Sequence, residues 1–312
     1  MSSYLNQSVV LATAGYDHTI RIWDVLYTTC LLTIPFTDSQ VNAIAINRDK
    51  KCLAAAGCSV IKLFDITGEH TDPLIGFEDH AGNIKSIGFQ KDSKWLFTAA
   101  EDGLLKIWDT RTSKCQRHFG AKGDGAINQA ILHPNQAEIL YVTSTGHLRT
   151  WDLSTNSCIE NIAVVPHSLD SISISLDASS LIVSSYLGSV YKWELINYNG
   201  SIQSSPQSSF KAQGKYLTRA LLSPDGKRIS TFSSDTNLRL WDASSFQLTC
   251  TLSGHQKWVW DGVFSIDSAF LISVSTDQTA RLWELSTGLT LKEYAGHKKG
   301  IISVALNDIP CI

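Results

Sequence analysis

LRLWD, at residues 238–242, is one of seven short segments that set the period of this chain. Each segment is mainly apolar and ends in an aromatic residue followed by an acid. The seven are IRIWD (20–24), IKLFD (61–65), LKIWD (105–109), LRTWD (148–152), VYKWE (190–194), LRLWD (238–242) and ARLWE (280–284). Their acids are 41, 44, 43, 42, 48 and 42 residues apart. A regular period of this length predicts a repeat architecture with seven units.

Each period carries the signals of about four short strands. Turns such as SPDGK (223–227) and EDG (101–103) separate segments rich in Val, Ile, Leu and aromatic residues, which favour strands. Units of about 40–45 residues with a WD signature resemble WD-repeat β-propellers. We therefore expect an all-β fold, a seven-bladed WD-repeat β-propeller that fills residues 1–312 as a single domain.

Four side chains, a His, a Ser or Thr, an Asp and a Trp, recur at fixed offsets within these units. The two complete sets are His80, Thr98, Asp102 and Trp108, and His255, Ser273, Asp277 and Trp283. A weaker copy is Gln213, Thr231, Asp235 and Trp241. In WD-repeat proteins such a tetrad is a hydrogen-bonded relay, and breaking its buried His–Asp pair would cost about 1–3 kcal/mol.

The two ends of the chain carry the halves of a third tetrad. Thr13, Asp17 and Trp23 have no His before them, and His297 has no such partners after it. We therefore expect a strand over residues 300–308 to join the N-terminal blade, which removes the open edges of the ring. The expected blades are residues 8–36 with 298–309, 37–77, 78–120, 121–163, 164–211, 212–253 and 254–297.

Composition and motifs exclude several classes of function. A net charge of −3 gives no basis for nucleic-acid binding, and no apolar run approaches the ~18 residues of a membrane span. The N-terminus MSSYLNQSVV lacks the pattern of a secretion signal, and seven cysteines without a CxxC pair indicate a reducing compartment. We expect a cytoplasmic protein with no nucleic-acid partner and no membrane insertion.

Catalytic and metal-binding motifs are missing from the sequence. There is no HExxH, GxSxG or GxxxxGK[ST] pattern, and GAKGDG (120–125) lacks the spacing of a dinucleotide fingerprint. The tetrads account for the acids that would otherwise suggest a catalytic set, which are Asp17, Asp102, Asp235 and Asp277. We therefore expect no enzyme activity, no metal site and no cofactor.

The first strand of each unit is expected to place two residues on one rim of the ring, on either side of a core residue such as Val259. In chain order the pairs are Gln40 and Asn42, Asn83 and Lys85, Ala126 and Asn128, Ser168 and Asp170, Tyr216 and Thr218, Trp258 and Trp260, and Gly300 and Ile302. Aromatic residues on one side and amides on the other fit a protein interface, where Trp and Tyr anchors contribute ~2 kcal/mol or more each. The alternative is that Trp258 and Trp260 fold over neighbouring loops as packing.

Four stretches resemble one family of WD-repeat proteins. They are VVLATAGYDHTIRIWD (9–24), DSQVNAIAI (38–46), LHPNQAEIL (132–140) and AGHKKGIISVALND (295–308). They look like the small WD-repeat subunit of the TOR kinase complexes, also called the G protein β-subunit-like protein or lethal-with-SEC-thirteen protein eight. The likeness runs over residues 8–308, and the segment KWVWD (257–261) is similar to a WMWG stretch of that family.

The resemblance implies a non-catalytic scaffold that binds and stabilises the C-terminal lobe of a TOR-type kinase domain. It would serve TOR complex 1 and TOR complex 2 in nutrient and growth signalling, beside the other subunits, and would be monomeric outside them. The complex could carry it to the surface of endomembranes. The rim residues that the resemblance implies for partner binding are Gln40, Asn42, Asn83, Asn128, Tyr216, Trp258 and Trp260.

Some features depart from the family pattern. Asp261 stands where the family has a small residue, Cys58 replaces a turn Asp, and the serine-rich stretch 197–210 is an insertion. The alternative hypothesis is a generic WD-repeat adaptor, such as a ubiquitin-ligase substrate receptor or a G-protein-β-like scaffold.

Overall fold

The structure is a computed structural model that describes residues 9–68, 70–120, 125–195, 202 and 205–309. All regular structure in these residues is β-strand, in 27 elements. The same residues contain no helix long and apolar enough to cross a membrane.

The strands are short, as expected for a repeat of hairpins. The first fourteen are β1 (Val10–Gly15), β2 (Thr19–Trp23), β3 (Cys30–Pro35), β4 (Ala43–Ile46), β5 (Cys52–Ala56), β6 (Cys58–Asp65), β7 (Ile75–Phe89), β8 (Trp95–Ala100), β9 (Leu105–Asp109), β10 (Cys115–Phe119), β11 (Ile127–Leu132), β12 (Glu138–Thr143), β13 (His147–Asp152) and β14 (Ser157–Ala163). The others are β15 (Leu169–Ile174), β16 (Ser180–Ser185), β17 (Ser189–Glu194), β18 (Ser208–Lys211), β19 (Leu217–Leu222), β20 (Arg228–Ser233), β21 (Leu238–Asp242), β22 (Leu248–Leu252), β23 (Val259–Phe264), β24 (Phe270–Ser275), β25 (Thr279–Glu284), β26 (Leu289–Ala295) and β27 (Ile301–Asn307).

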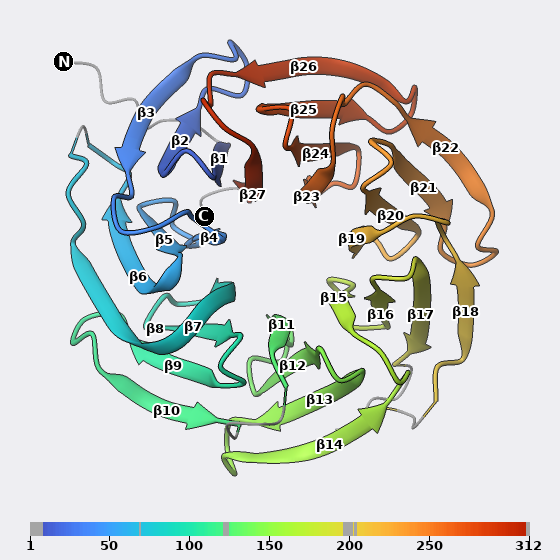
Figure 1. The fold of residues 1–312 in the computed structure, drawn as a ribbon, viewed down its shortest axis with the longest axis horizontal. Coiled ribbons are helices and arrows are strands. Elements are labelled where there is room, and N and C mark those ends of the chain that lie inside the picture. The colour runs from blue at the N-terminus through green and yellow to red at the C-terminus, as the bar shows by residue number, and fades with distance from the viewer. Residues whose placement is uncertain (1–8, 69, 121–124, 196–201, 203–204, 310–312) are drawn as a thin grey trace.

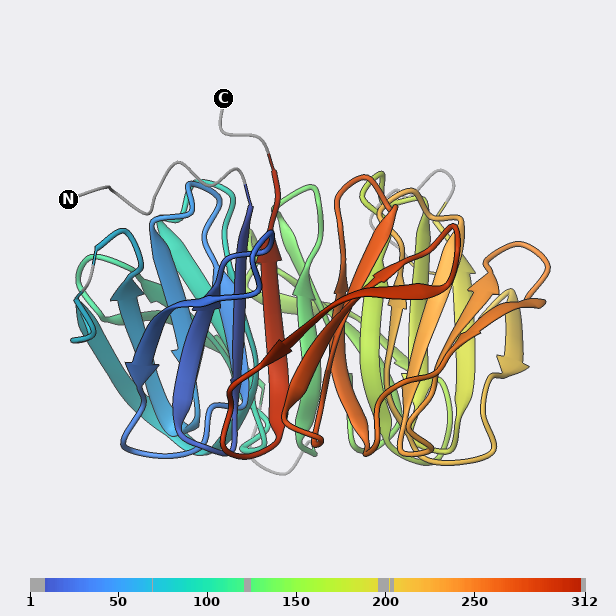
Figure 2. The ribbon, with the colours of Figure 1, turned by 90° about the horizontal axis from the view of Figure 1, so that it is seen from above.

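The strands form a closed ring of antiparallel sheets around a central axis (Figure 1). Four sheets are simple meanders, β11 to β14, β15 to β18, β19 to β22 and β23 to β26. The innermost strands are β27, β4, β7, β11, β15, β19 and β23, and the strands run between two opposite faces of the ring (Figure 2). The expected seven-bladed WD-repeat propeller is confirmed.

The first blade joins the two ends of the chain. Its sheet has the order β27-β1-β2-β3, so the C-terminal strand is innermost. Ala12 lies opposite Ala305 and Val10 lies opposite Asn307 in the antiparallel pairing of β1 with β27. The expected ring closure is therefore correct, with the strand over Ile301–Asn307.

Blades two and three share one seven-stranded sheet, which differs from the expected division. The boundary expected between residues 77 and 78 falls inside β7, a strand of 15 residues. Its first part pairs with β6 and its second part with β8. Cys58, at the position of the turn Asp of blades one, three, six and seven, lies in β6 and pairs with Asn83 of β7, so the sheet continues from blade two into blade three.

The aromatic residues of the seven signature segments are among the largest side chains of the core. Trp23, Phe64, Trp108, Trp151, Trp193, Trp241 and Trp283 are all buried. Trp23, for example, packs with Ile272 and Val274 of the neighbouring blade. Burying each large side chain stabilises the fold by about 2–3 kcal/mol, so the signature aromatics hold adjacent blades together.

Candidate protein-interaction site

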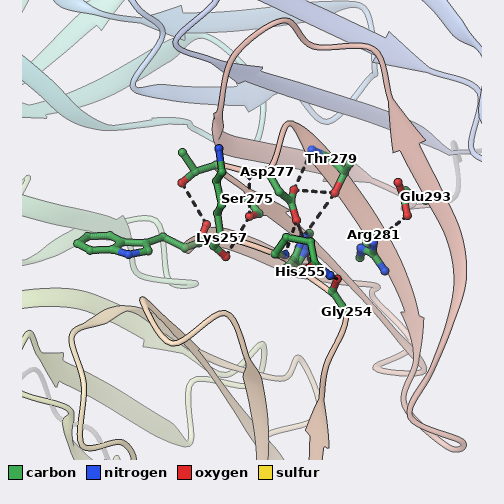
Figure 3. A network of polar contacts seen from close by, with 12 residues as sticks. Gly254, His255, Lys257, Ser275, Asp277, Thr279, Arg281 and Glu293 are labelled. Carbon is green, nitrogen blue, oxygen red and sulfur yellow. Dashed lines mark hydrogen bonds and ion pairs between the residues drawn. The ribbon is translucent and has the colours of Figure 1, made fainter.

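Three hydrogen-bonded tetrads fix the turns on one face of the ring, the face at which the innermost strands begin; we call it the site face. In blade seven, His255 Nδ1 lies 2.8 Å from Asp277 Oδ2, and His255 Nε2 lies 2.8 Å from Ser273 Oγ. Trp283 Nε1 donates to the same Ser273 oxygen at 2.8 Å. Figure 3 shows His255 and Asp277 facing one another, with Thr279 beside them.

The other two tetrads repeat this geometry. His80 lies 2.9 Å from Asp102 and 2.7 Å from Thr98, whose hydroxyl accepts from Trp108 at 2.8 Å. The third tetrad spans the ring closure. In it His297 lies 2.8 Å from both Asp17 and Thr13, and Trp23 donates to Thr13 at 2.7 Å.

The weaker copy in blade six is incomplete. Gln213 Nε2 donates to Thr231 at 3.4 Å and Trp241 donates to the same hydroxyl at 3.0 Å. Asp235 pairs with Arg239 at 2.8 Å, and the Gln213 carbonyl oxygen is buried without a hydrogen-bond partner in the described structure. The Gln213 amide reaches Thr231 but does not bridge to Asp235, whereas the imidazole of the other tetrads contacts both the hydroxyl and the carboxylate.

Burial in the blade-three tetrad favours a neutral His80, and the contacts in the blade-seven tetrad favour a charged Asp277. Burial lowers the pKa of His80, although its hydrogen bond to Asp102 acts in the opposite direction. Burial alone would raise the pKa of Asp277, yet the hydrogen bond and charge of His255, with backbone and hydroxyl donors, lower that pKa far below its usual range. A partner-stabilised carboxylate of this kind adds stability at neutral pH.

The turn of the blade-seven tetrad also holds the segment that carries Trp258 and Trp260. Ser275 Oγ donates to the carbonyl of Lys257 at 3.2 Å, and Thr276 N donates to the carbonyl of Trp258 at 3.0 Å. The Trp260 indole donates to Thr276 Oγ1 at 2.8 Å. Ser275 and Thr276, in the turn that the tetrad closes, therefore orient both tryptophans.

Five rings form a row along the site face, here called the aromatic arc. They are His167, Tyr186, Tyr216, Trp258 and Trp260, with successive ring centroids 5.8, 5.8, 6.0 and 5.7 Å apart. Tyr216 remains 43% exposed and Trp258 remains 44% exposed. The rings pack on one another, yet two of them keep nearly half of their surface open, as binding anchors do.

A one-residue bulge recurs in six innermost strands and aims side chains into the central channel. The bulged residues are Lys85, Asn128, Asp170, Thr218, Trp260 and Ile302. Together with Asn42 of blade two they line a cavity of about 290 Å³ at the mouth of the channel. A bulge redirects the side chain of the extra residue, which here sets the composition of the mouth.

The residue after each bulge joins its blade to the next. Ser86 Oγ donates to the carbonyl of Ala130 at 2.8 Å, and Ala220 N donates to Ser171 Oγ at 2.8 Å. Blade two has Ala43 at this position, which has no polar side chain, and there the blades are joined by the continuous β7 instead. These contacts between neighbouring blades form a belt around the channel, which makes the mouth a rigid surface.

Charges at the channel mouth are mostly paired. Lys85 lies 2.9 Å from Glu101, and Arg219 pairs with Asp261 of the next blade. Asp170 Oδ1 accepts from Ser168 at 2.9 Å, whereas its Oδ2 is buried without a hydrogen bond in the described structure. Burial raises the pKa of Asp170 to about 6, against the opposing effects of the Ser168 and Tyr216 hydroxyls and the Lys85 charge.

Comparison with known proteins identifies the family. The family described as "WD domain, G-beta repeat" matches residues 3–24, 71–109, 204–242 and 246–284. The target of rapamycin complex subunit wat1 of Schizosaccharomyces pombe is 44% identical over 246 residues, 77% of this chain and 77% of that protein. This chain belongs to the LST8 family of WD-repeat proteins. The family expected from the sequence is confirmed.

Other LST8 proteins give the same result. The target of rapamycin complex subunit LST8 of Saccharomyces cerevisiae is 42% identical over 251 residues, 80% of this chain and 82% of that protein. The subunit of the same name from Mus musculus is 36% identical over 249 residues, 78% of this chain and 76% of that protein.

The structure distributes the expected partner-binding residues of this LST8-family chain between two places. Gln40, Asn42, Asn83, Asn128 and Trp260 line the channel mouth. Tyr216 and Trp258 lie in the exposed part of the aromatic arc. The site face therefore combines a polar mouth with an aromatic border.

Two of the amides at the mouth are engaged within the protein. The Asn83 amide donates to Glu101 at 2.8 Å, and the Asn128 amide donates to the carbonyl of Leu169 at 2.7 Å. The Asn42 nitrogen is buried and has no hydrogen-bond partner in the part of the chain that the structure describes. The Asn83 and Asn128 side chains are thus already oriented.

Sequence reasoning placed Asp170 on the rim but did not select it, and it missed Tyr186 and His167 of the aromatic arc. Asp170 occupies the same position in its unit as Asn128 and Trp260, so the repeat spacing alone could have selected it. Tyr186 comes from a turn between β16 and β17, and only the folded ring brings it to 5.8 Å from the Tyr216 ring. Within the described residues no group of three or more His, Cys, Asp or Glu side chains could hold a metal ion.

Proposed function

We propose that this chain is a subunit of TOR complexes that binds a TOR-type kinase through the site face. The exposed aromatic arc carries the proposal, because it lies on a chain whose relatives are named target of rapamycin complex subunits. Two adjacent aromatic anchors of this kind contribute most of the binding free energy in many protein interfaces.

The geometry suits a constitutive scaffold. Thr276 holds the Trp258 and Trp260 segment in place, so little conformational entropy is lost when a partner binds. An interface near the standard ~1,600 Å² would cover the aromatic arc and part of the channel mouth. The partner surface would be the C-terminal lobe of the kinase domain, and binding would stabilise the active kinase in TOR complex 1 and TOR complex 2.

The proposed role is non-catalytic. The tetrad residues and the serines of the belt between blades are engaged in hydrogen bonds within the protein, which supports a structural rather than a chemical task. We propose a cytoplasmic protein that reaches endomembranes only as part of the complex.

Affinity purification of the tagged chain from its native cells tests this function. We expect a TOR-sized kinase in the eluate, and its absence would refute the proposal. Recovery of a ubiquitin ligase or another assembly in its place would favour the generic adaptor.

The double substitution Trp258→Ala with Trp260→Ala should abolish kinase recovery and leave the melting temperature little changed. Tyr27→Ala is a matched control, because Tyr27 is 75% exposed on the turn after β2, at the opposite face. A large loss of stability in the double variant would instead show that the tryptophans serve packing.

A further inference from the structure

The site face displays lysines unevenly around the ring. One lysine directly precedes the first rim residue in each of three consecutive blades. They are Lys215 in blade six, Lys257 in blade seven and Lys299 in blade one. Lys298 lies beside Lys299, and all four side chains are exposed. The corresponding positions in the other blades are Ser39, Gly82, Gly125 and His167, so the positive charge is confined to one side.

None of these four lysines takes part in an ion pair with a described residue. The lysines on the other side of the site face are neutralised by acids of their own blades. Those pairs are Lys62 with Asp38, Lys85 with Glu101 at 2.9 Å, and Lys106 with Asp79 at 2.5 Å. The ammonium groups that lack an acidic partner among the described residues are therefore gathered on blades six, seven and one.

The turns that carry these lysines are fixed by the fold. The backbone nitrogen of Lys298 donates to Asp17 at 2.9 Å, and that of Gln256, next to Lys257, donates to Asp277 at 2.9 Å. Both acceptors are tetrad carboxylates. The innermost strands β19, β23 and β27 that follow these turns are neighbours around the ring (Figure 1). The turns that carry Lys257, Lys298 and Lys299 are thus held by the tetrads rather than being loose loops.

The lysine row borders the exposed part of the aromatic arc. Lys215 precedes Tyr216 and Lys257 precedes Trp258, whose rings stack with centroids 6.0 Å apart. A ligand for this surface needs negative charges at intervals together with apolar groups that cover two aromatic rings. An acidic polypeptide segment with interspersed apolar side chains has both, and its charges would meet free ammonium groups on the rim.

We propose that blades six, seven and one form a docking strip for an acidic segment of the partner protein, with Lys215, Lys257 and Lys299 facing its carboxylates. The inference rests on the proposed function in that the partner would be the kinase or another complex subunit. Charges on an exposed rim act mainly on the rate of association, because they steer the encounter and are screened by salt.

A charge-reversal variant tests the strip. Lys215→Glu with Lys257→Glu and Lys299→Glu should lower the association rate with kinase immunopurified from cells depleted of this chain, by about tenfold at low salt. The difference should shrink to within about twofold at 0.5 M salt, where exposed charges are screened. The matched control is Lys91→Glu with Lys94→Glu and Lys227→Glu, the same charge change on exposed turns of the opposite face.

A second measurement separates this inference from the proposed function. Poly-L-glutamate of about 20 residues should change the tryptophan fluorescence of the wild-type chain in a salt-dependent manner, and the triple variant should show no change. If the triple variant binds kinase and polyglutamate like the wild type while the tryptophan double variant loses kinase, the lysine strip is refuted and the proposed function stands. Tighter binding of a single-stranded oligonucleotide of equal charge would also overturn the inference, in favour of a nucleic-acid ligand.

Discussion

The Trp258 indole lies over the Tyr216 ring of the neighbouring blade, with the ring centroids 6.0 Å apart and the planes 22° from parallel. The contact joins blades six and seven at their rim and leaves both rings nearly half exposed. A stacked pair that is already ordered offers a partner a large apolar surface at a small entropic cost.

Thr276→Val should weaken partner binding without unfolding the protein. The substitution removes the acceptor of the Trp260 indole and one of the two donors to the Trp258 carbonyl, so both rings become less ordered. We expect a loss of kinase affinity of about three- to tenfold, equivalent to about 1 kcal/mol. Thr287→Val, on an exposed turn of the same blade, is the control. An affinity equal to the wild type would show that the hydrogen bond to Thr276 does not position the anchors.

Asp170→Asn should make the protein more stable at neutral pH. Burial raises the pKa of Asp170 from its ordinary value near 4 to about 6, so the folded chain holds a proton more tightly than the unfolded chain between these values. Stability therefore falls as pH rises through that window, by about 1–3 kcal/mol, and the neutral amide avoids the loss. Urea unfolding at pH 7.5 and pH 4 checks this.

The stabilisation from Asp170→Asn should be present at pH 7.5 and nearly absent at pH 4. Asp72→Asn, an exposed acid beyond β6, controls for the change in net charge. A destabilised Asn variant at pH 7.5 would mean that the carboxylate is needed to hold the Asn128 and Ser168 side chains.

Asp261→Ala should be strongly destabilising. Asp261 is 4% exposed, pairs with Arg219 of blade six, and accepts the backbone nitrogens of Gly262 at 2.6 Å and Val304 of blade one at 3.2 Å. Removing it leaves the Arg219 charge without its partner, which costs about 3–5 kcal/mol. Adding Arg219→Met should recover part of the loss in a double-mutant cycle measured by urea unfolding. A loss below about 1 kcal/mol would show that the pair does not hold blades six and seven together.

Asp277→Asn should lower stability at neutral pH and flatten its acid dependence. The hydrogen bond and charge of His255 outweigh burial and lower the pKa of Asp277, so the wild type gains stability above the unfolded pKa near 4 and loses it as pH falls further. The variant should be about 1–3 kcal/mol less stable at pH 7 and should differ less from the wild type at pH 2.5. Thermal unfolding across this range measures the effect; a constant difference at all pH values would exclude the ionised carboxylate as its source.

Contacts within one blade follow from the sequence, whereas contacts between blades depend on the folded ring. Trp23, Trp108 and Trp283 recur with their tetrads at fixed offsets, so the blade count and the ring closure followed from the sequence. The boundary at residues 77 and 78 did not, because β7 pairs with β6 over its first part and with β8 over its second, a pairing that forms only in the folded ring. The sequence identified Asp170 only as a rim residue, because the burial that raises its pKa depends on neighbours from other blades.

The sequence by itself determined the fold, the family and which side chains stand on the rim, because these depend on periodic spacing along the chain. Only the tertiary structure decided which rim residues meet one another. The Tyr216–Trp258 stack of the aromatic arc, the Arg219–Asp261 pair and the row of free lysines all join residues about 40 positions apart. The rotation from one blade to the next brings those residues together, and spacing along one strand does not specify that rotation.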